Sequence, residues 1–415
     1  MQDLQEIGRL SKESSQELIK MNTKEKNIIL KGIAEAIIEN KDNILQANAL
    51  DVKEAETRHI KISLIDRLKL NEERLLDMVQ GIKDIALLDD PIGEIIEGKK
   101  LENGLEIIKK RVPLGVIAII YEARPNVTTD AFALCFKTGN SVILKGGSDA
   151  INTNIEIVKV IKKTIKKFNV NSNCITLIED TSKETTMQLM KLNKYIDVLI
   201  PRGGKNLIKT VVENSTIPVI ETGSGNCHIY VDEFANMQKA LNIIENAKTQ
   251  RVGVCNSCES LVIHKNIEKE ILPKLVNVLK KHNVEIRGDE YAKKLVPEIE
   301  RASEKDFITE YLDYIISIKS VDSIQDAIKH INLCSTKHSE CIITENYENA
   351  QKFLNEIDSS CVYVNASTRF TDGGQFGLGA EIGISTQKLH ARGPMGLKEL
   401  TTMKYAIYGS GQIRI

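Results

Sequence analysis

The chain has 415 residues, of which 42% are hydrophobic and 27% charged, and its formal net charge at pH 7 is −1. This length and ordinary composition predict two large domains. The near-zero net charge gives no reason to expect nucleic acid or a membrane surface as a partner. The longest apolar run, residues 112–120, is too short to span a bilayer. The N-terminus is polar and acidic, unlike a signal peptide, and the eight cysteines lie far apart except for Cys255 and Cys258. These features predict a reducing cytoplasm with free thiols.

Helices are expected from residue 1 to about residue 88, because apolar residues recur there three or four positions apart. A β-hairpin follows, with strands at 95–101 and 105–110. Asn103-Gly104 between them favours a type I′ turn, in which both central residues need a positive φ. The mixed polarity of these strands predicts that the hairpin projects as an interaction arm, with a surface flap as the alternative.

From residue 116 onward, short apolar runs alternate with helical segments, which predicts parallel sheets with helices on both faces. The first set of strands is expected at 116–120, 141–145, 174–178, 197–200 and 218–220. The second set is expected at 261–263, 313–320, 341–344 and 361–364, after a helix at 233–250. The short, strand-like tail at 395–415 is a candidate partner for the hairpin.

Glycine-rich turns follow several of the expected strands. Ligands of parallel sheets bind at the carboxyl ends of the strands, where glycine lets the backbone approach ribose or phosphate. The candidate cofactor-binding residues are Lys145, Gly146, Gly147, Ser148, Arg202, Gly203, Gly204 and Gly223. Basic side chains here favour NADP over NAD, although the standard G-x-G-x-x-G fingerprint is absent.

Cys255 lies between an expected helix and an expected strand, 34 residues after Glu221. A thiolate is a nucleophile, a helix or turn N-terminus lowers a thiol pKa, and nearby backbone N–H groups can hold an oxyanion. A buried structural cysteine is the alternative. The spacing to Cys258 also permits a redox pair or half of a zinc site, but no second pair completes a metal set. Glu221 is a candidate general base or thiol-orienting group, or a surface carboxylate.

Arg124 and Asn126 follow the first strand of the alternation. Arg124 suits an acidic substrate or phosphate, and Asn126 can donate to an oxyanion or serve as a helix N-cap. Arginine is scarce in this lysine-rich chain, so arginines beside Gly, Pro or Cys motifs are candidates for sites that need a planar guanidinium. These are Arg124, Arg202, Arg251, Arg369 and Arg392.

Together these motifs resemble the γ-glutamyl phosphate reductase family of the aldehyde dehydrogenase superfamily. The resemblance rests on residues 121–127, 142–148, 200–204, 221–228, 250–256 and 378–397; the family usually has His or Tyr where this chain has Cys334. It implies an α/β fold of two doubly wound domains and a small β oligomerisation arm. The implied boundaries are 1–94, 113–227 and 363–394 for the NADPH-binding domain, 228–362 for the catalytic domain, and 95–112 with 395–415 for the arm.

The resemblance also implies a reaction: NADPH-dependent reduction of L-glutamyl 5-phosphate to L-glutamate 5-semialdehyde and phosphate, in proline biosynthesis, without a metal. The implied roles are catalysis by Cys255, Glu221 and Asn126, substrate binding by Arg124, Arg251 and Asn256, and a contact of Glu310 with the cofactor's nicotinamide ribose. A cytoplasmic homo-oligomer is expected, which can associate with the preceding glutamate kinase. The alternatives are a hydrolytic, NAD-dependent aldehyde dehydrogenase with Glu221 activating water, and a catalytically silent nucleotide-binding protein.

Overall fold

The computed structural model describes residues 3–58, 60 and 62–414. The chain divides into two units. The first comprises Met1–Glu221, Gly377–Gly383 and Met395–Ile415, and the second comprises Thr222–Phe376 and Ile384–Pro394. Within the described ranges, every helix is too short or too polar to cross a membrane.

The first unit begins with helices, which confirms the prediction for this part of the chain. They are α1 (Leu4–Leu18), α2 (Thr23–Glu39), α3 (Lys41–Thr57), α4 (Ile62–Leu68) and α5 (Glu72–Leu87). Side-chain caps fix the starts of α1 and α2: Asp3 accepts hydrogen bonds from the N–H groups of Gln5 and Glu6, and Asn22 and Glu25 form a capping box. Helices α2 and α3 pack against α7 (Ile151–Lys167).

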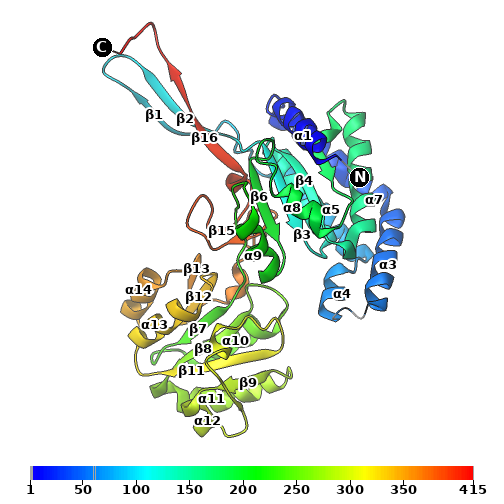
Figure 1. The fold of residues 1–415 in the computed structure, drawn as a ribbon. Helices are drawn as coiled ribbons and strands as arrows, with labels where there is room; N and C mark the ends of the chain where they lie inside the picture. Colours follow the sequence, from blue (N-terminus) through cyan, green and yellow to red (C-terminus); the bar gives the residue numbers. More distant parts are fainter. Residues whose placement is uncertain (1–2, 59, 61, 415) are drawn as a thin grey trace. The chain divides into compact units, whose positions relative to one another are not determined.

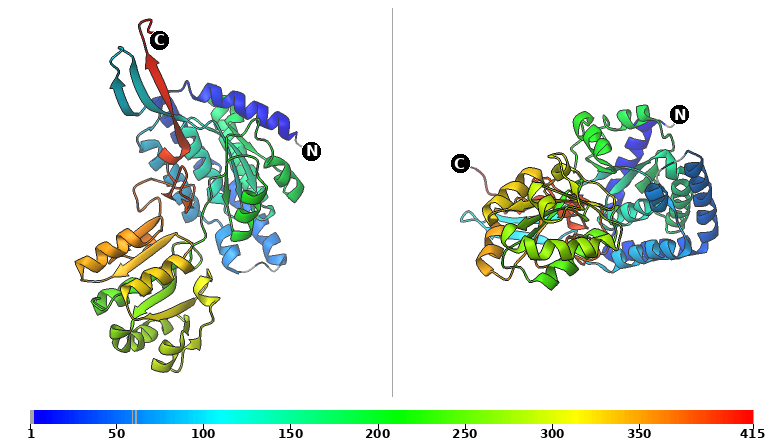
Figure 2. Two further views of the ribbon diagram at one scale, coloured as in Figure 1. Left: turned by 60° about the vertical axis from the view of Figure 1, so that its left-hand side comes forward. Right: turned by 90° about the horizontal axis from the view of Figure 1, so that it is seen from below.

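A parallel four-stranded sheet forms the centre of the first unit, in the order β5-β4-β3-β6. Its strands are β3 (Val116–Tyr121), β4 (Ser141–Gly146), β5 (Ile175–Leu177) and β6 (Val198–Arg202). All of β3 and β4 is buried because helices cover both faces (Figures 1 and 2). One face packs against α1, α8 (Lys183–Leu189) and α9 (Lys205–Asn214), and the other against α6 (Pro125–Lys137) and α7. The doubly wound prediction is therefore confirmed.

The strand expected at 218–220 is reduced to a single bridge between Val219 and Leu199. Pro218 lacks an N–H group and cannot extend the ladder on that side. Glu221 therefore ends the first unit outside regular structure rather than at the end of a strand.

Residues 395–415 do supply a partner strand for the hairpin. β1 (Ile95–Lys100), β2 (Glu106–Pro113) and β16 (Thr401–Tyr408) form an antiparallel sheet in the order β1-β2-β16. This three-stranded sheet, which we call the arm, extends away from the helices of the first unit (cyan and red in Figure 1). All of β1 and most of β16 is exposed to solvent.

The turn at the tip of the arm differs from the prediction of a type I′ turn. Leu101 N–H donates to Leu105 O at 2.8 Å, so three residues, not two, form the loop. Gly104 N–H donates to Leu101 O at 2.9 Å, and Gly104 is the only one of these loop residues with a positive φ, 88°. This is the pattern of a three-residue hairpin loop with a glycine bulge.

The second unit contains a seven-stranded parallel sheet, in the order β10-β9-β11-β8-β7-β12-β13. Its strands are β7 (Cys227–Val231), β8 (Cys258–His264), β9 (Glu285–Gly288), β10 (Glu300–Arg301), β11 (Ile315–Val321), β12 (Ser339–Ile343) and β13 (Cys361–Val364). The helices are α10 (Met237–Thr249), α11 (Lys265–Lys280), α12 (Glu290–Leu295), α13 (Ile324–Cys334) and α14 (Tyr347–Glu356). The predicted strands are present, whereas β7, β9 and β10 were not predicted.

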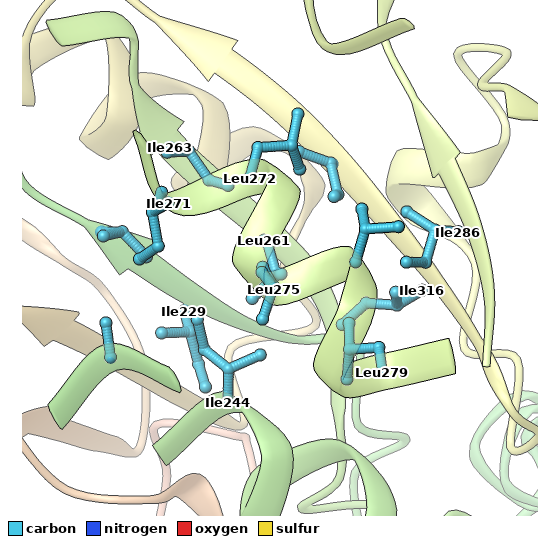
Figure 3. Close-up of a cluster of buried hydrophobic side chains, with 14 of the residues drawn as sticks. Ile229, Ile244, Leu261, Ile263, Ile271, Leu272, Leu275, Leu279, Ile286 and Ile316 are labelled. Atoms are coloured by element: carbon cyan, nitrogen blue, oxygen red, sulfur yellow. The ribbon is translucent and has the colours of Figure 1, made fainter. Parts of the chain in front are cut away.

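Alternate residues of the central strands face different helices. Ile229, Leu261 and Ile263 pack against α10 and α11, and Figure 3 shows the α11 leucines lying over this face. Tyr230 and Val262 point the other way, toward α13 and α14. The sheet is therefore buried on both faces, as expected for parallel strands.

The second unit includes residues 222–227, 363–376 and 384–394, which the predicted domain boundaries assign to the NADPH-binding domain. Gly223 N–H donates to Ile384 O at 2.8 Å, and β14 (Ile384–Ser385) pairs with β15 (Gly393–Pro394), so these segments hold one another within the second unit. Residues 363–376 join the same unit because they complete and directly follow β13 and hydrogen-bond to Asn256.

Candidate active site

Cys255 lies in the loop between α10 and β8, at the amino-terminal edge of the seven-stranded sheet. Ser257 N–H donates to Val254 O at 3.2 Å, which closes a turn around Cys255 and Asn256. The Cys255 side chain is half-exposed and forms no disulfide. The loop follows the carboxyl end of α10, so the chain does not place this thiol at the start of a helix.

The backbone at Gly225 packs directly against the backbone of Cys255, and we call this contact the floor of the nucleophile loop. A Cβ atom at position 225 would lie 1.4 Å from the Cys255 carbonyl oxygen and 2.7 Å from its Cα. The Cys227 thiol donates to the same carbonyl oxygen at 3.1 Å. The backbone of the nucleophile loop is therefore fixed against the segment that leads into β7, and only glycine permits this approach.

Glu310 is tied to the same floor, because its Oε1 accepts the Gly225 N–H at 2.6 Å. Two residues further on, Leu312 N–H donates to Glu259 Oε1 at 3.1 Å. Glu259 also forms a fully buried ion pair with Lys248 at 2.6 Å. Burial raises the pKa of Glu259 to about 7, against the opposing effect of Lys248. Glu259 thus connects the two ends of the nucleophile loop to the segment that carries Glu310.

Asn256, predicted to bind substrate, is buried and holds the loop in place. Its Nδ2 donates to Thr371 O at 2.8 Å and to Arg369 O at 3.3 Å. Thr368 Oγ1 donates in return to Asn256 O at 2.7 Å. Arg251, the other predicted substrate residue of this loop, is exposed.

Gly223 is required by packing within the second unit. A Cβ atom there would lie 2.3 Å from Thr386 Cγ2. Cys258 is buried in β8, where its thiol donates to Ser260 O at 3.4 Å. In the described part of the chain, no group of three or more His, Cys, Asp or Glu side chains is arranged to hold a metal ion.

In the first unit, the turns after β3, β4 and β6 meet at the carboxyl edge of the sheet. Glu122 N–H donates to Arg202 O at 3.1 Å, and Gly204 N–H donates to Glu122 Oε2 at 2.9 Å. A Cβ atom on Gly203 would lie 2.7 Å from Glu122 Cδ, and one on Gly147 would lie 3.7 Å from Glu122 Cα. The chain moves from β3 to β4 on one side and returns to β6 on the other, which is the switch point where such sheets bind ligands.

Two cations line this edge of the first unit. Lys145 is 2% exposed, and its Nζ donates to Gly146 O at 3.4 Å. Burial lowers the pKa of Lys145, while Asp180 acts to raise it. The Nε of Arg202 is buried and has no hydrogen-bond partner among the described residues. Backbone turns without Cβ atoms beside under-partnered cations fit an anionic nucleotide.

Arg124 and Asn126 lie at the start of α6. Arg124 is the N-cap residue and Pro125 begins the helix, so the interpretation of Asn126 as an N-cap is wrong. Asn126 is exposed in the first turn, and its Nδ2 donates to Asp130 Oδ2 at 3.0 Å. Burial raises the pKa of Asp130 to about 7, with the Asn126 hydrogen bond opposing it.

Comparison with known proteins identifies this combination of a thiol loop and glycine turns. The aldehyde dehydrogenase family model matches residues 2–313 and 309–405. The chain belongs to the aldehyde dehydrogenase family. It is an oxidoreductase of that family, since its full-length relatives at 55–58% identity are gamma-glutamyl phosphate reductases.

Individual relatives of this aldehyde dehydrogenase show how far the similarity extends. Gamma-glutamyl phosphate reductase of Lachnospira eligens is 58% identical over 414 residues, which is 100% of both chains. The crystal structure of gamma-glutamyl phosphate reductase from Thermotoga maritima is 49% identical, covers 100% of both chains and gives a TM-score of 0.96. An engineered glycolyl-CoA reductase with bound NADP+ shares the fold, at 16% identity, 97% and 93% coverage and a TM-score of 0.69. The predicted family resemblance is confirmed.

The sequence assigned no catalytic, substrate-binding or cofactor-binding role to two residues of this aldehyde dehydrogenase site. Arg369 lies on the segment hydrogen-bonded to Asn256, and its sequence signal was only that arginine is rare. Glu259 lies in a run of buried strand residues, and nothing in that run of the sequence indicates that a lysine pairs with its carboxylate. The catalytic role predicted for Glu221 stays a prediction, as do the individual cofactor contacts.

Proposed function

We propose that the chain catalyses the NADPH-dependent reduction of L-glutamyl 5-phosphate to L-glutamate 5-semialdehyde and phosphate, in the cytoplasm, as the second step of proline biosynthesis from glutamate. The observation that carries the proposal is the half-exposed Cys255 thiol on a turn fixed by Gly225, Cys227 and Asn256. The substrate follows from the name shared by the full-length relatives.

In the proposed reaction, Cys255 Sγ attacks the carbonyl carbon of the acyl phosphate. A C–S bond forms, the C–O bond to phosphate breaks, and phosphate leaves with the electron pair. Backbone N–H groups of the turn and the Asn126 side chain are the proposed donors to the developing oxyanion. When bound, NADPH supplies the hydride that reduces the thioester. The C–S bond then breaks, and Cys255 is released as a thiolate together with the aldehyde.

Water is not a reactant in this sequence, so Glu221 need not activate one, and we propose that it orients the thiol. We assign the binding of substrate anions to Arg124 and Arg251. Asn256 supports the loop, since both hydrogen bonds of its amide nitrogen go to backbone carbonyls.

The first-unit turns support NADPH as the cofactor. Lys145 and Arg202, with Gly146, Gly147, Ser148, Gly203 and Gly204, are proposed to bind its phosphates and ribose. An arginine and a lysine at this place favour a ligand with an additional phosphate, hence NADPH over NADH. In the second unit, Glu310 is proposed to bind the nicotinamide ribose.

The arm is proposed to mediate homo-oligomerisation. Its strands expose large apolar side chains, which include Ile95, Met403, Tyr405, Ile407 and Tyr408, and exposed apolar patches mark interaction surfaces. Sedimentation of the intact protein against a variant lacking 402–414 tests this, with a smaller species expected for the variant. An added glutamate kinase in the same experiment tests for the second proposed partner.

The activity itself is tested in the reverse direction. Purified protein is incubated with pyrroline-5-carboxylate, which equilibrates with the semialdehyde, and NADP, with and without phosphate, while NADPH absorbance is followed. We expect phosphate-dependent NADPH formation that is abolished in Cys255→Ala and retained in Cys361→Ser, another half-exposed cysteine. Phosphate-independent turnover would instead show a hydrolytic enzyme with Glu221 as base. No turnover with NADP or NAD would contradict both activities.

A further inference from the structure

Arg369 lies on the short helical turn η4 (Thr368–Phe370) that follows β13. Its Nε donates to Gln250 Oε1 at 2.9 Å, just before the nucleophile loop. On the other side of Cys255, Asn256 is joined to this segment by the three hydrogen bonds described above. The segment around Arg369 is therefore attached to the nucleophile loop both before and after the thiol.

The Arg369 guanidinium is half-buried. Burial lowers the pKa of Arg369, Asp372 and Cys255 act to raise it, and the neighbouring Arg251 acts to lower it. The Asp372 carboxylate accepts hydrogen bonds from the N–H groups of Gly374 and Gln375. A partly desolvated cation is costly unless an anion compensates it, and the nearby Cys255 is such an anion only as a thiolate.

A cation near Cys255 would offset an unfavourable charge in the surroundings of the thiol. The carboxyl end of α10 precedes the loop, and the carboxyl end of a helix carries partial negative charge, which disfavours a thiolate and an anionic substrate. A guanidinium presents its N–H groups as a planar fork that matches carboxylate and phosphoryl oxygens. With Nε held by Gln250, the fork is oriented by the loop that carries the nucleophile.

We propose that Arg369 is an oxyanion-binding residue of the Cys255 site, which holds an anionic group of the substrate while the thiol attacks. This rests on the proposed function, whose substrate carries two such groups, the phosphoryl group on the acyl carbon and the carboxylate at the far end. Arg369 thereby also selects for dianionic over neutral acyl substrates.

The kinetic test uses the full-length variants Arg369→Gln and Arg369→Lys in the reverse reaction. The control is Arg301→Gln, an exposed arginine on β10. We expect Arg369→Gln to raise the KM for phosphate or for the semialdehyde at least tenfold, with partial rescue by Lys and no change in the control. A rise for phosphate assigns Arg369 to the phosphoryl group, and a rise for the semialdehyde assigns it to the carboxylate. Both KM values within twofold of wild type would overturn the proposal.

A second measurement does not require turnover. The alkylation of Cys255 by iodoacetamide is followed by mass spectrometry, with inorganic phosphate or L-glutamate as the probe. Phosphate or glutamate should slow alkylation of the wild type several-fold and lose this effect in Arg369→Gln, whose folding is checked by circular dichroism. Equal protection of both proteins, or no protection of either, would refute the role of Arg369. Protection that depends on Arg369 without phosphate-dependent turnover would refute the proposed function alone.

Discussion

The two parallel sheets carry their candidate functional residues at opposite edges. In the first unit, Lys145 and the glycine turns around Glu122 lie where strands end, at the switch point between β3 and β6. In the second unit, Cys255 and Gly225 lie where β8 and β7 begin. The first arrangement follows the usual rule for ligands of parallel sheets, and the second does not.

The two edges also differ in the contacts that hold their functional residues in place. The carboxyl edge of the first unit is made of backbone turns, which can accept a ligand without further support. The amino edge of the second unit is held by a buried ion pair, a thiol–carbonyl hydrogen bond and cross-links from Asn256. A nucleophile must stay within a fraction of an ångström of its working position, which explains the heavier support.

The largest expected effect comes from breaking the buried ion pair. Lys248→Met leaves the Glu259 carboxylate buried and unpaired, which should lower the free energy of unfolding by about 3–5 kcal/mol. Urea titration measures this. The control Lys294→Met breaks an exposed pair with Glu290, and its midpoint should scarcely move. If the two variants unfold alike, the buried pair does not support the amino edge.

Gly225→Ala tests the floor of the nucleophile loop. The added Cβ would overlap the Cys255 carbonyl, so the loop must shift and kcat should fall about 100-fold, the scale expected for displacement of a reacting group by about 1 Å. Gly98→Ala is the control, because no atom lies within 4 Å of its added Cβ. Near-normal kcat in Gly225→Ala would show that the loop tolerates displacement.

Glu268→Gln probes the opposite, carboxyl edge of the second sheet. Glu268 is buried, accepts Ser320 Oγ at 2.8 Å at the end of β11, and its Oε2 has no hydrogen-bond partner in the described part of the chain. Burial raises its pKa from 4.5 to about 7, with Asp289 adding to the rise and Ser320 and Lys265 opposing it. The native state then binds this proton more tightly than the unfolded state.

Stability from the protonated Glu268 is full below pH 4.5 and is lost as the pH rises through 7. The Glu268→Gln variant has no such titrating group. Its free energy of unfolding, relative to that of the wild type, should therefore rise by on the order of 2 kcal/mol between pH 5 and 8. Urea titrations across that range measure it. Unchanged kcat/KM is expected in the same variant, and a fall in kcat/KM would contradict a functional site confined to the amino edge.

Gly203→Ala should give the smallest effect, because the added Cβ meets the flexible ends of Glu122 and Leu207 rather than backbone. We expect the KM for NADP to rise a few-fold with kcat retained, measured against Gly98→Ala. A loss as large as that of Gly225→Ala would show that the turns of the first unit need the same rigidity as the nucleophile loop.

The fold was predictable because its signals are local. Short apolar runs between helical segments indicated most strands of both sheets, and the tail strand was recognised as a partner of the hairpin. The turn at Asn103-Gly104 was not predictable in detail, since the same dipeptide fits two- and three-residue loops, and the register across β1 and β2 decides between them.

The site was predictable only where a residue type carries its own chemistry. Cys255 and the glycine turns can be recognised from their residue types. The hydrogen bond between Glu310 and Gly225 joins residues 85 positions apart, and residue type alone does not indicate it. Asn256 shows the converse limit: its type suggested a substrate contact, which stays a prediction, but not that tertiary packing directs its amide nitrogen to backbone carbonyls. Such roles depend on which loops meet, which no local pattern encodes.

The order of strands in the arm has a consequence for synthesis. Arg111 on β2 donates a side-chain hydrogen bond to Thr401 at the start of β16, and these two residues are 290 positions apart in the sequence. At typical elongation rates of about 5–20 residues per second, the β1–β2 hairpin waits roughly 15–60 s for its third strand. Lys109 and Lys110 lie on the waiting edge, where charged side chains discourage pairing with neighbouring nascent chains. The arm is therefore completed only after the strands of both α/β sheets have been synthesised.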